Sequence, residues 1–328
     1  MEPFRHKNVL VTGGLGFIGS NMVRRLVTLG ANVTIIDSMN PEYGGNLFNI
    51  DGIGEKVSVI IADVRDAAKL DDAVRGKHFL FNLAGQVSHI DSMTDPMTDM
   101  EMNVRGQLCV LECCRKKNPD VKIVFAGTRQ VYGKPLYLPV DEKHPILPTD
   151  INGINKLAAE WYHIMYNNVH NIRACSIRMT NVYGPRQLIK HNRQGFIAWF
   201  IRQIVEGSEI SIFGDGSQIR DFNYVDDVVD AMLLAASKEE SNGQIFNLGA
   251  DEFITLKELV TMLVDIRGTG TYKIVPFPAE KKRIDIGNFY GDYTKIAKTL
   301  GWKPKTQLKE GLAQTIAYYT KNLRHYLE

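Results

Sequence analysis

Three glycines near the N-terminus have the spacing needed to hold a phosphate group. Gly13, Gly16 and Gly19 follow a short apolar run at residues 9–12, and helical periodicity follows at residues 21–29. Glycine lets the backbone turn tightly and lets an anion approach the free amide groups at a helix N-terminus. An apolar strand, a glycine turn and a helix in this order predict a site for the pyrophosphate of a dinucleotide.

Asp37 indicates which dinucleotide this site prefers. It ends a second apolar run at residues 33–36. A carboxylate at that point can accept hydrogen bonds from an adenosine ribose and repels a 2′-phosphate, so NAD is favoured over NADP. Asp63 ends a third apolar run, where it could reach an adenine amino group or cap the next helix.

The elements that must position these residues alternate between strands and helices. Further apolar runs at residues 57–62, 79–83, 121–126 and 173–179 read as strands, and residues 95–117 and 152–166 read as helices. This alternation predicts an α/β fold, a Rossmann-type doubly wound parallel sheet covered on both faces. Beyond Asn181 the alternation stops, so we expect a smaller α/β substrate-binding lobe interleaved with the sheet. The expected division gives residues 1–182 plus about 217–250 to the NAD-binding domain, and about 183–216 plus 251–328 to the lobe.

The composition of the chain limits the kinds of partner that it is expected to bind. The chain has 328 residues and a formal net charge of +2, which gives no support for nucleic acid or a membrane surface as a partner. No apolar run is long enough to span a bilayer, and the first residues lack a signal-peptide core. The four cysteines fall inside predicted helices or strands without a C-x-x-C pair. We therefore expect no metal, reduced thiols and a cytoplasmic protein.

Several further motifs together resemble one known family. They lie at residues 12–19, 82–85, 128–133, 181–186, 214–221 and 300–304. The set resembles the extended short-chain dehydrogenase/reductases that modify nucleotide sugars, over nearly the whole chain. Residues 84–87 and 186–200 are most similar to CDP-tyvelose 2-epimerases and related UDP-sugar 4-epimerases.

The resemblance implies NAD as cofactor, a nucleotide-diphosphate sugar as substrate and transient oxidation of a sugar hydroxyl as the reaction. It implies that Asn181, Arg220 and Arg283 contact the diphosphate. It also implies a homodimer, formed through helices near residues 95–117 and 152–168. The residues expected to bind the cofactor are Gly13, Gly16, Phe17, Ile18, Gly19, Asp37, Asn40, Asp63, Val64, Leu83, Ala84, Gly85 and Lys156.

One position departs from the family pattern. In the family, a Tyr-x-x-x-Lys pair supplies the base and a ribose-binding cation, whereas this chain has Asn152 four residues before Lys156. An amide has no useful pKa and cannot act as a general base. Lys156 itself is the leading replacement, and His89 and Asp91 are further candidates. Tyr132 and Tyr162 are weaker ones.

The neighbouring positions limit the reaction. Thr128 occupies the place of a family Ser or Thr that hydrogen-bonds the reacting hydroxyl. The alternative is a strand-end turn residue, and we favour the functional role because Lys156 follows. Family dehydratases carry an Asp-Glu pair next, but this chain has Arg129 and Gln130, which disfavours dehydration. The sequence therefore favours an epimerase with a replaced base. The alternatives are a nucleotide-sugar dehydrogenase or reductase without epimerisation, and a catalytically silent protein that binds NAD and nucleotide sugar.

Overall fold

A seven-stranded sheet, parallel at every described pairing, forms the centre of the computed structural model, which describes residues 2–327. The strand order is β10-β6-β5-β4-β1-β2-β3, so the order reverses between β1 and β4. This arrangement confirms the predicted Rossmann-type sheet. Its strands are β1 (Asn8–Thr12), β2 (Asn32–Asp37), β3 (Val57–Ile61), β4 (Phe79–Asn82), β5 (Lys122–Thr128), β6 (Ala174–Met179) and β10 (Ile245–Asn247).

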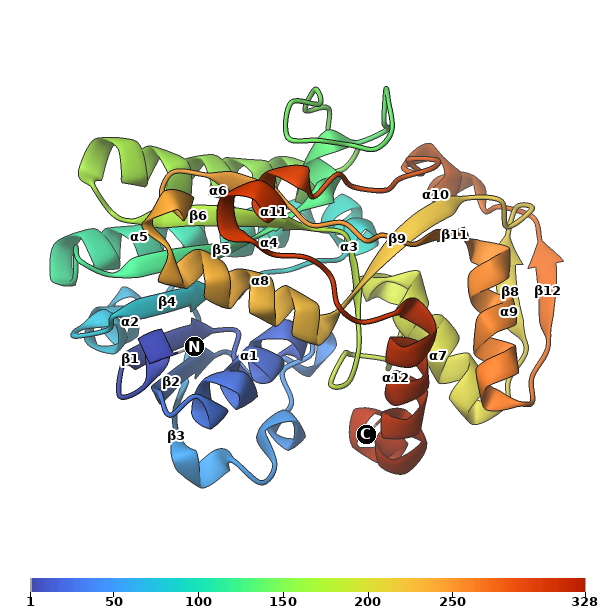
Figure 1. The fold of residues 1–328 in the computed structure, drawn as a ribbon, viewed down its shortest axis with the longest axis horizontal. Helices are drawn as coiled ribbons and strands as arrows, with labels where there is room; N and C mark the ends of the chain where they lie inside the picture. Colours follow the sequence, from blue (N-terminus) through green and yellow to red (C-terminus); the bar gives the residue numbers. More distant parts are fainter. Residues whose placement is uncertain (1, 328) are drawn as a thin grey trace.

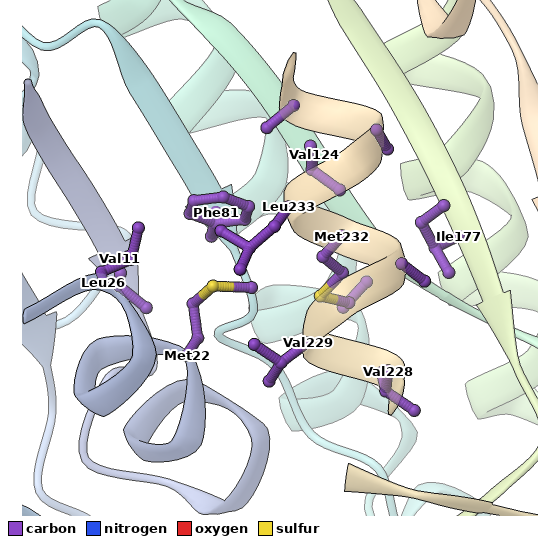
Figure 2. Close-up of a cluster of buried hydrophobic side chains, with 14 of the residues drawn as sticks. Val11, Met22, Leu26, Phe81, Val124, Ile177, Val228, Val229, Met232 and Leu233 are labelled. Carbon is purple, nitrogen blue, oxygen red and sulfur yellow. The ribbon is translucent and has the colours of Figure 1, made fainter. Parts of the chain in front are cut away.

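Helices cover both faces of the sheet (Figure 1). One face packs against α1 (Phe17–Thr28), α8 (Val225–Ser237) and α11 (Thr294–Leu300), and the other against α2 (Ala67–Val74), α5 (Gly106–Lys117) and α6 (Ile151–His170). Figure 2 shows Met22 of α1 and Leu233 of α8 beside Phe81 of β4. Because both faces are covered, the central strands β1, β4 and β5 are mostly apolar and buried along their length.

Helix α6 carries the position of the missing tyrosine, and both of its ends are capped. The Asp150 side chain accepts a hydrogen bond from the Gly153 amide, and Asn171 ends the helix in the left-handed conformation. The helix is tied to β6 by a buried ion pair between Glu160 and Arg178, with N···O 2.5 Å. These contacts fix where α6 lies relative to the ends of β5 and β6.

The helical run predicted for residues 95–117 contains a π turn. It consists of α4 (Pro96–Met100), a π turn at Glu101–Arg105 and then α5. A short helix, α3 (His89–Thr94), precedes it. Met97 before the turn is 62% exposed, whereas Leu111 after it is fully buried. The apolar side chains of this run are therefore outside the core at its N-terminal end and inside it toward its C-terminal end.

A second hydrophobic core lies beside the sheet, formed mainly by α7, α9 and α12 around β8. Two small sheets belong to this region, with orders β11-β9-β7 and β12-β8. The division of the chain by residue range into two domains stays a prediction. Of the described helices, none is long and apolar enough to cross a membrane. The elements here are β7 (Asn181–Tyr183), α7 (Phe196–Glu206), β8 (Ile210–Phe213), β9 (Ile219–Tyr224), β11 (Phe253–Thr255), α9 (Leu256–Arg267), β12 (Tyr272–Val275), α10 (Ala279–Arg283) and α12 (Leu308–Asn322).

Candidate active site

The three glycines of the first turn have different structural roles. Gly13 has φ +67°, a conformation that favours glycine. A Cβ on Gly19 would lie 2.0 Å from the Gly13 carbonyl oxygen, so only glycine lets α1 pack this closely on the turn. Gly16 caps α1 and borders open space beyond the Gly13 carbonyl. The backbone is thus shaped to receive an anion at the N-terminus of α1.

Asp37 is held at the end of β2 by backbone amides. Its Oδ2 accepts a hydrogen bond from the Leu15 amide at 2.9 Å, and its Oδ1 accepts one from the Met39 amide at 2.8 Å. Burial raises the pKa of this carboxyl, while the two amide bonds oppose that rise. Each carboxylate oxygen keeps a further lone pair for a ribose hydroxyl.

A single cavity of about 290 Å³ runs along the carboxyl ends of the strands. It extends from the glycine turn and Asp37 to Thr128, Asn152 and Lys156. Every residue that the sequence assigns to the cofactor lines it. Among these, Asp63 also forms an ion pair with Arg65 at 2.8 Å, and Asn40 also caps a short helical turn. The structure therefore brings the predicted dinucleotide residues and three of the predicted catalytic residues to one place.

Asn152 is locked into a buried amide network. Its Nδ2 donates to the Asp99 carboxylate at 2.8 Å and to the Gln86 carbonyl oxygen at 2.9 Å. Asn155 donates to the other oxygen of Asp99, also at 2.8 Å, and Asn103 donates to the Gln86 carbonyl oxygen. Asn152 is 1% exposed. Its side chain is therefore a structural tie between α6 and the segment after β4, and it offers no proton acceptor with a useful pKa.

Lys156 lies one helical turn beyond Asn152 and is enclosed. Its Nζ donates to the Ala126 carbonyl oxygen at 3.3 Å and lies 5.2 Å from the centre of the Phe125 ring. Burial lowers the pKa of Lys156 to about 8, and the carboxylate of Asp99 opposes this shift. The ammonium group of Lys156 is thus held in the cavity wall, where it can donate hydrogen bonds to a bound ligand.

The end of β5 connects this cavity to His89. Thr128 Oγ1 accepts a hydrogen bond from the Gln130 amide at 3.2 Å, so Thr128 does cap the turn after β5. Its hydroxyl hydrogen remains able to donate to a ligand. The Gln130 side chain lines the cavity and reaches His89, whose other ring nitrogen contacts Asp150. His89 itself stands just outside the cavity wall.

The remaining candidate bases are occupied elsewhere. Asp91 pairs with Arg193 at 3.3 Å. Tyr132 is fully buried, donates to Asn247 and has its pKa raised to about 12 by burial. Tyr162 packs against the core between α5 and the sheet. The structure thus leaves two candidates: Lys156, which lines the cavity, and His89, which contacts the cavity residue Gln130.

The residues expected to bind the diphosphate lie on the side of the second core and do not line this cavity. Arg220 is 6% exposed, pairs with Asp285 at 3.6 Å and has a buried Nε without a partner among the described residues. Asn181 accepts a hydrogen bond from Arg129 at 3.3 Å. Arg283 ends the short helix α10 on the exterior.

Sequence reasoning missed two groups at this site. Burial, with nearby Arg220, lowers the pKa of Arg129 to about 10, and its guanidinium donates to Asn181, one of the residues expected to bind the diphosphate. Asp150 was not among the predicted site residues, although its place before a predicted helix indicates a cap.

The sheet, the glycine turn and the cavity define a Rossmann-type dinucleotide-binding protein. The donors around Lys156, the acceptors at Asp37 and the space beside Gly16 all fit NAD. The described residues contain no group of side chains that could hold a metal ion.

Comparison with known proteins gives the family. The profile of the "NAD dependent epimerase/dehydratase family" matches residues 9–249. A UDP-glucose 4-epimerase from Mycolicibacterium smegmatis is 33% identical over 311 residues, covering 94% of this chain and 97% of that protein. The chain belongs to the NAD-dependent epimerase/dehydratase family, and so to the extended short-chain dehydrogenase/reductases.

Solved structures are similar over almost the full length. The UDP-glucose 4-epimerase of Thermotoga maritima, determined with UDP-glucose, has a TM-score of 0.87 and 33% identity, covering 96% of this chain and 99% of that one. The UDP-glucose 4-epimerase of Thermus thermophilus, in complex with NAD, has a TM-score of 0.84 and 30% identity, covering 95% and 98%. The NAD dependence predicted from Asp37 is confirmed at the level of the family.

Proposed function

We propose that this protein is an NAD-dependent nucleotide-sugar epimerase that oxidises a sugar hydroxyl transiently and uses a base other than tyrosine. The observation that carries the proposal is the single cavity that joins the glycine turn and Asp37 to Thr128 and Lys156. Bound NAD supplies a hydride acceptor that can return the hydride to either face of the sugar. The similarity to two UDP-glucose 4-epimerases supports a UDP-sugar as the first substrate to test.

The protein's own residues align the sugar and manage its proton. Thr128 donates a hydrogen bond to the reacting oxygen and orients it. Lys156, buried and cationic, binds the nicotinamide ribose and favours negative charge on that oxygen. Asn152 keeps α6 in place through Asp99, so its role is positional.

We assign the binding of the substrate diphosphate to arginine side chains near the second hydrophobic core. The buried Nε of Arg220 has no partner among the described residues, and a phosphate oxygen would satisfy it. Asn181 and Arg129 lie together next to this region. Arg283, exposed at the end of α10, is assigned the same ligand on the family resemblance alone.

A panel of nucleotide sugars tests the function. Purified protein is incubated with UDP-glucose, UDP-galactose and their N-acetylated, CDP- and dTDP-linked counterparts. An epimerase gives a new sugar stereoisomer by NMR and, with a slow substrate, transient absorbance of reduced cofactor. Reduced cofactor that accumulates with a ketosugar product indicates a dehydrogenase. Binding without either signal indicates a silent protein, the alternative that the occupied amide of Asn152 favours.

We also propose a homodimer, because two adjacent helices share an exposed apolar face. Met97 on α4, and Ile154 and Trp161 on α6, are each more than half exposed. A second copy that packs the same face would form a four-helix interface with two-fold symmetry. Light scattering should show a dimer for the wild type and for Leu136→Glu, an exposed control, but a monomer for Trp161→Glu. The cytoplasmic location stays a prediction.

A further inference from the structure

A histidine and a carboxylate from distant parts of the chain form a dyad beside the cavity. His89 begins α3, and Asp150 caps α6. His89 Nδ1 donates to Asp150 Oδ2 at 2.5 Å, while Asp150 Oδ1 accepts from the Gly153 amide at 2.7 Å. The carboxylate is 1% exposed and the imidazole 38% exposed. A buried acceptor, fixed through both oxygens, therefore orients a ring whose other edge is accessible.

This contact determines which ring nitrogen can take a proton. A neutral imidazole that donates from Nδ1 carries its lone pair on Nε2. In the structure the Gln130 side-chain amide donates to that nitrogen. The Oε1 of the same amide is buried without a partner among the described residues.

Gln130 links the dyad to the reacting position. Its side chain lines the cavity, and its backbone amide donates to Thr128 Oγ1 at 3.2 Å. A sugar hydroxyl that replaces the Gln130 amide at His89 would lie beside the Gln130 side chain, on the turn that Thr128 caps at the cavity. The unpartnered Oε1 would then accept from a second, neighbouring sugar hydroxyl, because the reacting hydroxyl donates its only hydrogen to His89 Nε2.

Electrostatic surroundings favour the charged product of such a transfer. Burial alone would raise the pKa of Asp150, but hydrogen bonds from His89 and Gly153 lower it, so the carboxylate stays ionised. An imidazolium at His89 is therefore paired with a buried anion. Lys156 differs in this respect, because the hydrogen bond described for its Nζ goes to the neutral Ala126 carbonyl oxygen.

We propose that His89 is the general base that replaces the family tyrosine, and that Asp150 is its positioning residue. The proposal rests on the epimerase function above. The sugar O–H bond breaks as an Nε2–H bond forms, and the oxygen electron pair closes a C=O bond while the same carbon releases its hydride to the bound cofactor. In the return step, His89 gives the proton back to the oxygen as the hydride returns to carbon.

Removal of the imidazole tests the base directly. With the NAD-loaded protein and UDP-glucose, or the sugar turned over best in the panel, His89→Ala should lower kcat by about 10²–10⁴-fold. NAD content and KM should change little, since the ring binds neither group strongly in the ground state. Added imidazole should restore activity at least about tenfold, because the site is open to solvent. His170→Ala, at the exposed end of α6, is the matched control and should neither lose activity nor respond to imidazole.

Asp150→Asn tests the orientation. Its side-chain oxygen can still cap α6 by accepting from Gly153, so the fold is retained while the anionic acceptor of His89 is lost. We expect kcat to fall about 10–100-fold with KM unchanged. In protein labelled with ¹⁵N-histidine, the His89 signals of the wild type should show protonated Nδ1, and this tautomer should be lost in Asp150→Asn even without substrate.

Three results would overturn the dyad while leaving the epimerase proposal intact. The first is a His89→Ala variant that keeps its activity. The second is a His89→Ala variant whose lost activity imidazole does not restore, together with a Lys156→Met variant that still holds NAD and is equally inactive. The third is a wild-type His89 that carries its proton on Nε2 in the absence of substrate. A wild-type protein that converts none of the sugars overturns the proposed function, and the dyad as its base with it.

Discussion

Replacing Lys156 by Met should make the nucleotide-free protein more stable while abolishing hydride transfer to NAD. At pH 7 the folded protein holds a buried ammonium whose pKa is lowered from 10.5 to about 8 by burial. The difference corresponds to about 3 kcal/mol of destabilisation at about 1.4 kcal/mol per pKa unit. Methionine removes that cost and gives up the hydrogen bond to Ala126, worth about 1 kcal/mol. We expect a net gain of about 2 kcal/mol in the free energy of unfolding.

The pH dependence of the stability difference between the wild type and Lys156→Met distinguishes the removal of a buried charge from a simple change in packing. The unfolded chain binds the proton up to pH 10.5 and the folded chain only up to about pH 8, so wild-type stability rises with pH across that window. Between pH 7 and 9.5 the wild type should regain about 2 kcal/mol relative to Lys156→Met. Urea unfolding at fixed protein concentration measures this difference. Lys134→Met, at an exposed site, is the control.

A stability difference that stays constant from pH 7 to 9.5 would refute the reasoning, because burial of the charge would then not be the cause. So would a variant that unfolds more easily than the wild type at pH 7. Undiminished turnover by Lys156→Met would refute the part of the argument that places this ammonium against the cofactor.

Three further predictions concern the frame around the site. Gly19→Ala should lower NAD affinity at least about tenfold, because its Cβ would lie 2.0 Å from the Gly13 carbonyl oxygen. The control Gly54→Ala, which has open space around it, should keep its NAD affinity. Isothermal calorimetry measures both affinities. Glu160→Ala should cost about 3–5 kcal/mol in urea unfolding, since it leaves the buried guanidinium of Arg178 without its anion. His163→Gln should remove acid sensitivity. Burial lowers the pKa of His163 to about 4, so the unfolded chain takes up a proton near pH 6.5 before the folded chain can, and wild-type stability falls as pH falls through that window.

The predictions for His163→Gln and Glu160→Ala would each be contradicted by a specific result. The wild type should lose about 2 kcal/mol more than His163→Gln between pH 7 and 5, and parallel losses would show that this histidine is not the buried group responsible. A loss below about 1 kcal/mol in Glu160→Ala would show that water or another anion compensates Arg178.

Local sequence was sufficient for the sheet and for the cofactor turn. Apolar runs became β1, β2, β4 and β5 within one or two residues, because buried parallel strands need apolar side chains on both faces. Helix α1 begins at Phe17, before the predicted residues 21–29, since Gly16 caps it and Gly19 fits inside its first turn. The three-residue strands β7 and β11 were missed because they exist only through pairing with β9, far away in the chain.

The parts of the site that depend on distant contacts could not be predicted in the same way. His89 and Asp150 are 61 residues apart, and nothing near either residue signals the other. The identity of Asn152 excluded a base, but its role as a donor to Asp99 required the packing of α4 against α6. The predicted roles of Arg220, Arg283 and Asn181 stay predictions.

The π turn at Glu101–Arg105 acts as a phase shift within one helical rod. Each residue advances an α-helix by about 100°, so one extra residue in a turn rotates everything beyond it by roughly that angle. Met97 can consequently face outward, toward the surface proposed for a second subunit, while Leu111 faces the sheet. Deleting one residue here would force a choice between the two faces, and it would also turn Asn103 away from the Gln86 carbonyl. A single deletion at a site away from NAD and the sugar would thus disturb both the proposed dimer surface and the wall of the active site.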